Sequence, residues 1–259
     1  MTRTAGGSGS ANEPRASATR AVPAMGLTYS EERRQVAEFD YTAWLSYAMA
    51  FSRGISKRLS GELYRRTAPP RQLLGAEIDT CQAALGFDVP IEFRKFLDAG
   101  LAGFRRSFCW GPTDAHRAEL HDLFGRQKNI YFGPKFIPLK ELPLYQAGAK
   151  LWATNYDQVE SDEAEILLHA LPFIGIDNGD FIAMDLRHSE DNPPVVFFAH
   201  EEGCFQLSRS LTRFLECWER LAYIGPEIWM LRPFIGMDGS LNENSEKASK
   251  LRAVFGAGI

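Results

Sequence analysis

The sequence has few cysteines and no long apolar run, and these shortages exclude several classes of protein. Its 259 residues include 4 cysteines, widely spaced and without a Cys-x-x-Cys pair, so we expect reduced, buried thiols and no disulfide framework. No apolar run approaches the ~18–20 residues that a membrane-spanning helix needs. The amino-terminal residues contain no hydrophobic segment before a cleavage site, so no secretory signal is predicted. We therefore expect a cytoplasmic protein that does not enter a membrane.

An excess of positive charge is also lacking. The formal net charge is -4, which excludes a generally basic protein that coats nucleic acid, and no nucleic-acid partner is predicted. What is present is apolar material: 45% of the residues are hydrophobic and 12% are aromatic. That is enough for one substantial core or two small ones, and it excludes disorder of the whole chain.

The common catalytic motifs are missing. The sequence has no Gly-x-Ser-x-Gly elbow, no Walker A loop and no Gly-x-Gly-x-x-Gly after a predicted strand. The run His200-Glu201-Glu202-Gly203-Cys204 is not the His-Glu-x-x-His zinc motif and falls in a predicted turn. Asp177, Asp180 and Asp185 could serve as paired carboxylates, but a turn and a strand end account for them. We predict no catalytic residue, no cofactor and no metal ligand.

The amino-terminal part of the chain divides into two segments. Residues 1–27 are rich in Gly, Ser, Ala, Arg and Thr and have no apolar periodicity, which predicts a disordered tail. Residues 28–71 are expected to form a helical extension, because apolar residues recur mostly at three- and four-residue steps. The opposite face is basic. It could meet a membrane surface or nucleic acid, but a helix docked on the next domain with solvated arginines is the preferred interpretation.

Further along, the pattern changes from helical to extended. Residues 72–98 predict two helices, and a polar helix is expected at 113–127 with short extended pieces at 130–132 and 136–139. Apolar runs between residues 173 and 207, one pair joined by an Asn-Gly turn, predict an antiparallel meander of about four strands. A helix starting at Ser208 or Ser210 would cover its buried face. Residues 223–259 are expected to form a helical tail.

Five short motifs occur in a specific order. A helix ends in Leu85-Gly86, Pro90 opens a helix that ends in Phe96-Leu97, and a Pro172-Phe173 strand follows. A Gly179-Asp180 turn then leads to a strand ending at Asp185, a Pro-Val strand with a His/Glu-Gly turn comes next, and a helix contains Phe214-Leu215. Over roughly residues 72–222 this order resembles the SUKH superfamily, also called the SMI/KNR family.

The resemblance implies an α+β fold, with a mostly antiparallel meander sheet packed against helices and helical extensions at both ends. It also implies a binding protein. Bacterial members are mostly immunity proteins that neutralise polymorphic toxins, often nucleases, and fungal members are scaffolds in cell-wall signalling. We therefore expect a non-catalytic protein whose partner is a cognate toxin domain. The alternatives are a regulatory scaffold that uses the added helices and, less favoured, a hydrolase with an unrecognised site.

Negative charge is concentrated in one stretch. Between Asp157 and Glu202 there are twelve Asp and Glu residues, and Arg187 is the only Lys or Arg. Six of these acids lie in predicted loops and turns of the meander and were expected to form one acidic rim that binds the partner: Asp177, Asp180, Glu190, Asp191, Glu201 and Glu202. An acidic surface would complement the cationic groove of a nuclease. The alternative is that these acids only solubilise polar turns.

Overall fold

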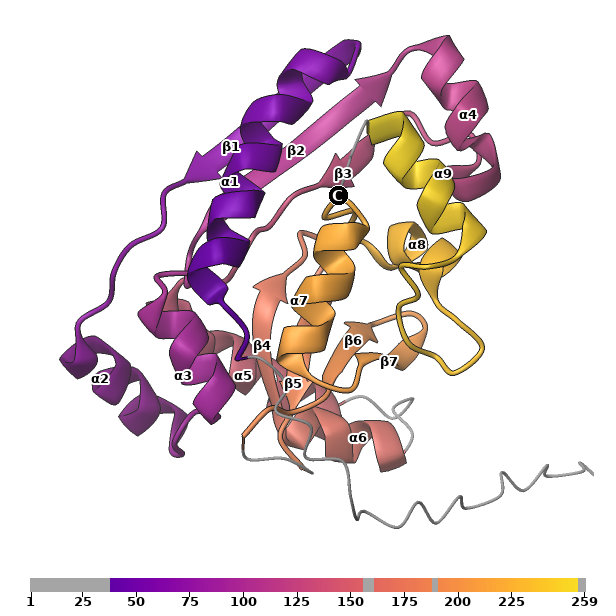
Figure 1. Cartoon of the computed structure of the whole chain (residues 1–259). Coiled ribbons are helices and arrows are strands. Elements are labelled where there is room, and N and C mark those ends of the chain that lie inside the picture. Colours follow the sequence, from indigo (N-terminus) through magenta and orange to yellow (C-terminus); the bar gives the residue numbers. More distant parts are fainter. Residues whose placement is uncertain (1–37, 156–160, 188–190, 256–259) are drawn as a thin grey trace, which may run out of the picture. The chain divides into compact units, whose positions relative to one another are not determined.

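Two antiparallel sheets organise the chain (Figure 1). Our computed structural model describes residues 38–155, 161–187 and 191–255. Sheet A has three strands in the order β1, β2, β3, which are Gly61–Ala68, Arg105–Pro112 and Ile130–Phe132. Sheet B has four strands in chain order, β4 to β7, which are Ala170–Gly175, Phe181–Asp185, Val195–Ala199 and Gly203–Ser208. The four-stranded meander and the α+β class predicted from the sequence are confirmed.

Sheet B is apolar on both faces, since every residue of β4, β5 and β6 is buried. The Asn178-Gly179 pair forms the predicted turn, and Gly179 adopts a φ of 99°, a conformation that suits glycine. One face of the sheet packs against α3, Ile91–Asp98, and α7, Leu211–Arg220. Ser210 caps α7 as predicted, accepting a hydrogen bond of 3.2 Å from the Arg213 N–H.

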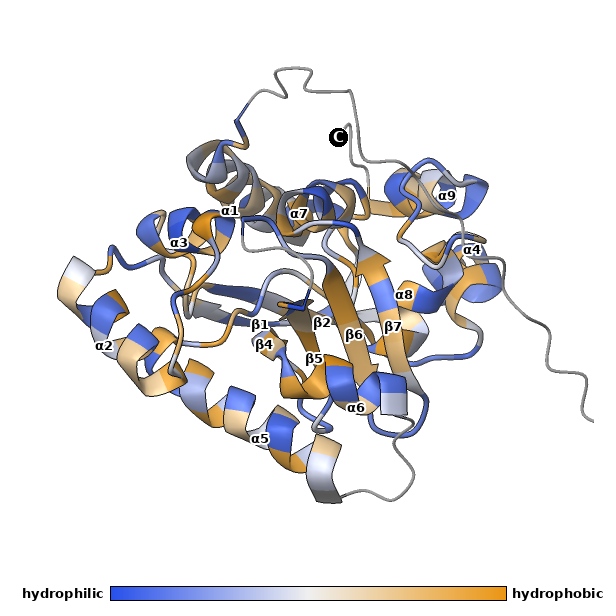
Figure 2. Ribbon diagram, turned by 90° about the horizontal axis from the view of Figure 1, so that it is seen from below, coloured by the Kyte–Doolittle hydropathy of each residue, from blue (hydrophilic) through white to orange (hydrophobic). Residues whose placement is uncertain are grey.

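The second face of sheet B has a helical layer of its own, which the sequence analysis missed (Figure 2). Helices α5, Leu142–Asn155, and α6, Ser161–Leu168, pack there on a separate apolar cluster. It contains Ala149 of α5, Leu167 of α6 and five strand residues that alternate with residues of the main core: Ala170, Phe181, Ala183, Val196 and Phe198. Strands buried on both faces therefore form the centre of a three-layer arrangement.

The expected helical extension at 28–71 is only partly right. Helix α1 spans Tyr41–Arg58 and is capped by the Asp40 side chain, but residues Gly61–Ala68 form strand β1. These residues pair with the whole of β2, and that ladder overrides the helical spacing of their apolar side chains. The first part of this extension, residues 28–37, and the predicted tail at 1–27 lie outside the described residues.

Helix α1 is part of the core rather than a separate appendage. Its apolar stripe is buried, and the Trp44 Nε1–H donates a hydrogen bond of 3.1 Å to the Leu215 carbonyl of α7. The ring of Trp44 also meets that of Tyr223 edge-on, with centroids 5.5 Å apart. Packing of this kind explains why the basic face of α1 remains solvated while its other face is docked.

The remaining helices follow the sequence prediction more closely. The two helices expected within residues 72–98 are confirmed as α2, Gly75–Leu85, and α3, with Gly86 left-handed at φ 81°. The predicted polar helix is α4, Asp114–Phe124. The piece expected to be extended at 136–139 leads into a 3₁₀ turn, η1, at Leu139–Glu141, where the sequence Leu139-Lys140-Glu141-Leu142 also predicts a brief helical turn.

The carboxyl-terminal part is helical, as predicted, but it completes the core instead of forming a tail. It contains three short elements: α8, Ile228–Leu231, η2, Arg232–Phe234, and α9, Glu246–Phe255. Phe234, Leu251 and Phe255 are buried in the main cluster. No helix within the described ranges is long and apolar enough to cross a membrane.

Candidate functional site: the sheet-A cleft

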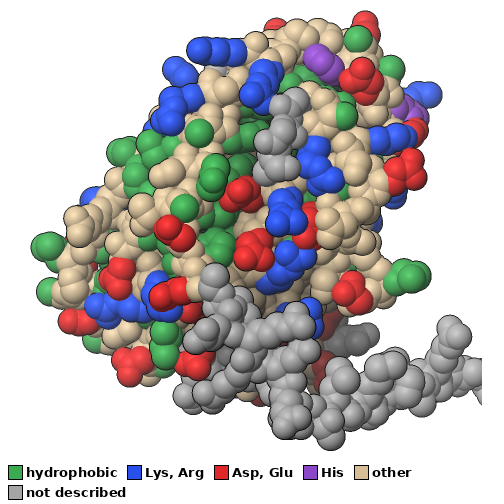
Figure 3. Space-filling model, viewed as in Figure 1, with side chains coloured by type: hydrophobic (Ala, Val, Ile, Leu, Met, Phe, Trp, Pro, Cys, Tyr) green, Lys and Arg blue, Asp and Glu red, His purple; other side chains and the backbone are tan. Residues whose placement is uncertain are grey.

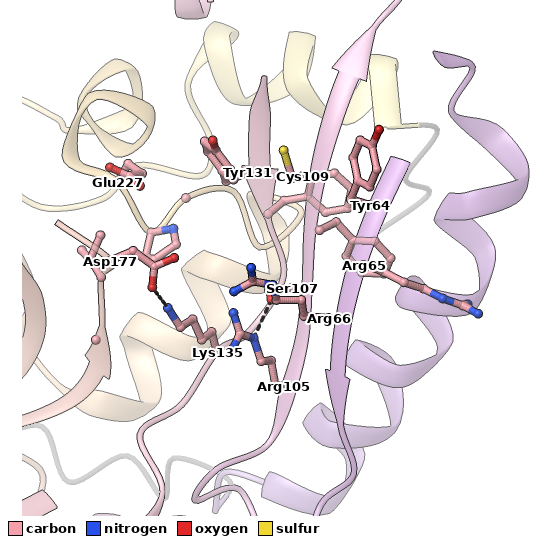
Figure 4. Close-up of a pocket in the computed structure, with 16 residues that line it drawn as sticks. Tyr64, Arg65, Arg66, Arg105, Ser107, Cys109, Tyr131, Lys135, Asp177 and Glu227 are labelled. Carbon is pink, nitrogen blue, oxygen red and sulfur yellow. Dashed lines mark hydrogen bonds and ion pairs between the residues drawn. The ribbon is translucent and has the colours of Figure 1, made fainter. Parts of the chain in front are cut away.

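A cleft of about 620 Å³ opens on the outer face of sheet A, beside the turn between β4 and β5. We call it the sheet-A cleft (Figure 4). Its wall is formed by strand residues of sheet A, by Lys135 just after β3, by Ile176 and Asp177 of the turn, and by Glu227 before α8. Segments far apart in the sequence therefore meet at one hollow.

Strand alternation explains the chemistry of this face. The register pairs Tyr64 with Cys109 and Cys109 with Tyr131, and it pairs Arg66 with Ser107. Side chains that alternate with these point the other way, and Trp110 is fully buried there. Sheet A thus buries one face in the core and leaves an open face with two tyrosines and an arginine.

Positive charge converges in the cleft. Lys135 forms an ion pair and hydrogen bond with Asp177, and the Arg105 Nε–H donates a hydrogen bond of 2.9 Å to Ser107 Oγ. The hydrogen bond from Lys135 lowers the pKa of Asp177, and the charges of Arg105 and Arg66 lower it further. Asp177 is therefore ionised at neutral pH and held among three cations.

Arg65 borders the same cleft but points away from it. In Figure 4 the side chain of Arg65 runs to the side of β1 opposite Asp177, whereas Arg66 turns toward Arg105 and Ser107. Consistently, the charge of Arg66 acts on the pKa of Asp177 and of Arg105. Arg65 and Arg66 are adjacent on β1, and their positively charged side chains therefore point to opposite faces of the sheet.

The six acids of the expected rim do not lie together. The turns β4–β5 and β6–β7 share one end of sheet B, so Asp177, Asp180, Glu201 and Glu202 lie at that end. Asp191 precedes β6 at the opposite end, where its carbonyl accepts a hydrogen bond of 2.9 Å from the Glu92 N–H. Glu190 lies outside the described residues. The expectation of one rim is wrong, because alternate loops of a meander leave by opposite ends.

Asp180 is a structural residue of its turn. It is only 3% exposed and accepts hydrogen bonds from the His200 backbone at 3.0 Å, the Asn178 amide at 2.8 Å and His200 Nδ1 at 2.5 Å. These bonds join the β4–β5 and β6–β7 turns. An acid held in this way cannot present its charge to a partner.

The other acids at this end of sheet B differ in their ion pairs and in their exposure to solvent. Asp177 is paired with Lys135, and Glu202 forms an ion pair with Arg232. The Glu201 side chain is 83% exposed, with Oε1 3.7 Å from His200 Nε2. On the face in Figure 3, acidic and basic side chains of the described residues are interspersed. Glu201 is thus the rim acid best placed to meet a partner, and the role of the rim stays a prediction.

The motif residues on which the resemblance rests serve the fold. Most are core residues of α2, α3, β4 and α7: Leu85, Phe96, Leu97, Phe173, Phe214 and Leu215. Pro90 precedes α3 and Pro172 lies at an irregularity of β4. The buried Asp185 forms an ion pair of 2.8 Å with Arg187. The pattern that identifies the chain is therefore a packing pattern and not a reaction site.

The thiols of the protein are poor nucleophiles. Burial raises the pKa of Cys81 and Cys109, and burial raises the pKa of Cys204 and Cys217 to about 12. Among the described residues, no three His, Cys, Asp or Glu side chains lie close enough to hold a metal ion. The polar groups of the sheet-A cleft can bind charge and donate hydrogen bonds.

The cleft is not predicted from the sequence, because its residues come from segments whose local patterns are misleading or weak. Arg66 was placed on a helical face, and Arg105 and Lys135 lie in the stretch with the weakest patterns. The available signal was a pair of basic doublets, Arg65-Arg66 and Arg105-Arg106. Only the pairing of β1 with β2 brings those doublets together.

Comparison with known proteins gives one match. The model of the SMI1/KNR4 family (SUKH-1) matches residues 73–217, which is more than half of the chain. No curated protein and no solved structure matches. The match agrees with the order of motifs and with the helix-backed meander observed here, and it confirms the resemblance. This chain therefore belongs to the SMI1/KNR4 (SUKH-1) family.

Proposed function

We propose that this chain is a non-catalytic protein-binding module, a bacterial immunity protein that binds and neutralises a polymorphic toxin. Family membership supports a binding role, and the observation that carries the proposal is the open face of sheet A. The cleft is preformed and contains tyrosine and arginine, residue types that often contribute most of the binding energy at protein interfaces. The protein would act in the cytoplasm, without nucleic acid or membrane as its partner.

The binding surface extends from the cleft to the adjoining turns of sheet B. Glu227 lines the cleft close to the turns of sheet B. Burial raises the pKa of its carboxyl, and the nearby charges of Asp180 and Asp177 raise it further. Arg66 and Arg105 line the cleft, and Glu201 is exposed in the β6–β7 turn. A partner would need the complementary arrangement of charge, which favours fast association and excludes wrong partners.

The two alternatives have less support. A scaffold using free added helices would need α1 to be available, but α1 is docked in the core through Trp44. A hydrolase would need a nucleophilic hydroxyl or thiol beside His200 Nε2, whereas the group beside this nitrogen in the described residues is the Glu201 carboxylate, 3.7 Å away. The raised pKa of each thiol also argues against cysteine chemistry.

The proposal is tested in two steps. Affinity capture of the chain from its native cells, followed by identification of the bound protein, should return a toxin, and a toxin gene beside the gene of this chain is the first candidate. Co-expression of that toxin with the chain should then restore growth, and the purified complex should have no toxin activity. A chain that binds the toxin but leaves its activity unchanged would contradict the immunity role.

A further inference from the structure

The sheet-A cleft holds more positive than negative charge. Three cations, Arg66, Arg105 and Lys135, and two acids, Asp177 and Glu227, line it, although the whole chain has a net charge of -4. In the part of the chain that the structure describes, Arg66 forms no hydrogen bond or ion pair, and the hydrogen bond of Arg105 goes to a neutral hydroxyl. Asp177 is the one acid with an ion pair to a cleft cation within those residues.

Asp177 indicates what kind of group the cations accept. Its carboxylate binds Lys135 and lies in the field of Arg66 and Arg105. The Asp177 side chain is 79% exposed and that of Lys135 is 23% exposed, so an incoming group reaches this ion pair from the side of Asp177. A second carboxylate could replace Asp177 on Lys135 or bind beside it on the two arginines, whose planar guanidinium groups match a carboxylate.

A carboxylate suits this cleft better than a phosphate. Asp177 is itself a carboxylate that binds Lys135 in the field of Arg66 and Arg105, so these cations already accept that group. Tyr64 is 66% exposed and shares the open face of β1 with Arg66, two residues further along the strand. Flat aromatic surface beside arginine is typical of contacts with another protein.

We propose that the sheet-A cleft binds an acidic side chain of the protein partner, with Arg66, Arg105 and Lys135 as the binding residues and Asp177 as a built-in competitor. This inference rests on the proposed function, because the partner is taken to be a protein. It adds a basic subsite to a partner-binding surface that the sequence predicts to be largely acidic.

The test uses a capped hexaglutamate peptide as probe, titrated into the full chain at low salt and followed by calorimetry and amide NMR shifts. Combined Arg66→Gln and Arg105→Gln should weaken binding about tenfold, as expected from losing two partly exposed charge contacts. Asp177→Asn should strengthen binding several-fold, because it frees Lys135. Arg65→Gln is the matched control: the same charge is lost on the same strand, and binding should change little.

Several outcomes would overturn the inference. One is equal binding of hexaglutamate by the wild type and by the Arg66→Gln/Arg105→Gln variant, with unchanged circular dichroism and thermal midpoint. Another is tighter binding of inorganic phosphate than of hexaglutamate at the same residues. Weaker binding by Asp177→Asn would exclude the competitor role.

Failure of this inference can be separated from failure of the proposed function. If the captured toxin binds the wild type and the double arginine variant equally, the cleft assignment is wrong while the immunity role stands. If hexaglutamate behaves as expected but no toxin is neutralised, the cleft assignment stands and the immunity role is wrong.

Discussion

At the scale of single residues, one buried carboxylate joins two distant parts of the core. Glu243 is 2% exposed and accepts hydrogen bonds from Arg213 Nη2 at 2.6 Å and Cys217 Sγ at 3.2 Å, both on α7. Its backbone carbonyl accepts a bond of 2.7 Å from Arg252 of α9. Burial tends to raise the pKa of Glu243, but these hydrogen bonds, that from Arg213 foremost, outweigh it, so the pKa is lowered.

We predict that Glu243→Gln lowers the free energy of unfolding by about 2 kcal/mol at pH 7, the usual contribution of charge-assisted hydrogen bonds. Because the folded pKa is lowered, this contribution is present above the unfolded pKa of about 4.3 and disappears as the pH falls through the folded value. Urea unfolding at several pH values measures it. The wild type and variant should converge in acid, and a constant difference would contradict the ionised state of Glu243.

The exposed Glu201 tests what remains of the acidic rim. Glu201→Lys should slow association with the captured toxin several-fold at low salt and leave the dissociation rate nearly unchanged, since exposed rim charges mainly steer encounter. Stopped-flow or surface-binding kinetics at two salt concentrations give both rates. Glu246→Lys, an exposed acid on α9, is the control. Equal association rates for the wild type and the Glu201 variant would remove the rim from recognition.

At the scale of elements, sequence predicted best where local chemistry and packing agree. The Asn178-Gly179 hairpin and helix α7 were predicted correctly, because turn residues and a strong helical periodicity dominate there. Strand β1 was misread, because isolated spacing cannot reveal a ladder with residues 105–112. Helix α5 was missed because Pro143 and Gly148 interrupt its pattern. A three-layer arrangement could still have been inferred from strands that are apolar on both faces.

The cap of α7 provides a direct test at this scale. Ser210→Ala should lower the free energy of unfolding by about 1 kcal/mol, the typical cost of losing an N-cap oxygen. Ser210→Asp keeps an acceptor for the Arg213 N–H and should retain most of the stability. Thermal or urea unfolding gives the comparison. An Ala variant as stable as the wild type would show that α7 is held by packing alone.

At the scale of the whole molecule, the family segment shares its core with the helices that flank it. Residues 73–217 match the family, but α1 before them and α9 after them bury large side chains in the same cluster, among them Trp44 and Phe255. Each such aromatic contributes about 3–5 kcal/mol when truncation to alanine is the measure. The free energy of unfolding of a domain is only about 5–15 kcal/mol. Removing the segments on both sides should therefore unfold the family segment.

We therefore predict that residues 72–222 alone do not fold cooperatively, whereas residues 39–259 do. Circular dichroism and urea unfolding of the two chains make the comparison. Trp44→Ala in the longer chain should already cost about 3–5 kcal/mol. A cooperative transition in the shorter chain would show that the family segment forms an independent core.

The central claim is that this chain recognises a protein partner at the sheet-A cleft and the adjoining turn end of sheet B. Hydrogen–deuterium exchange of the full chain, alone and in complex with the captured toxin, tests it most directly. We predict new protection in residues 61–68, 105–112 and 175–180, with little change in α5 and α9. Protection confined to α5, α9 or the basic face of α1 would contradict the claim.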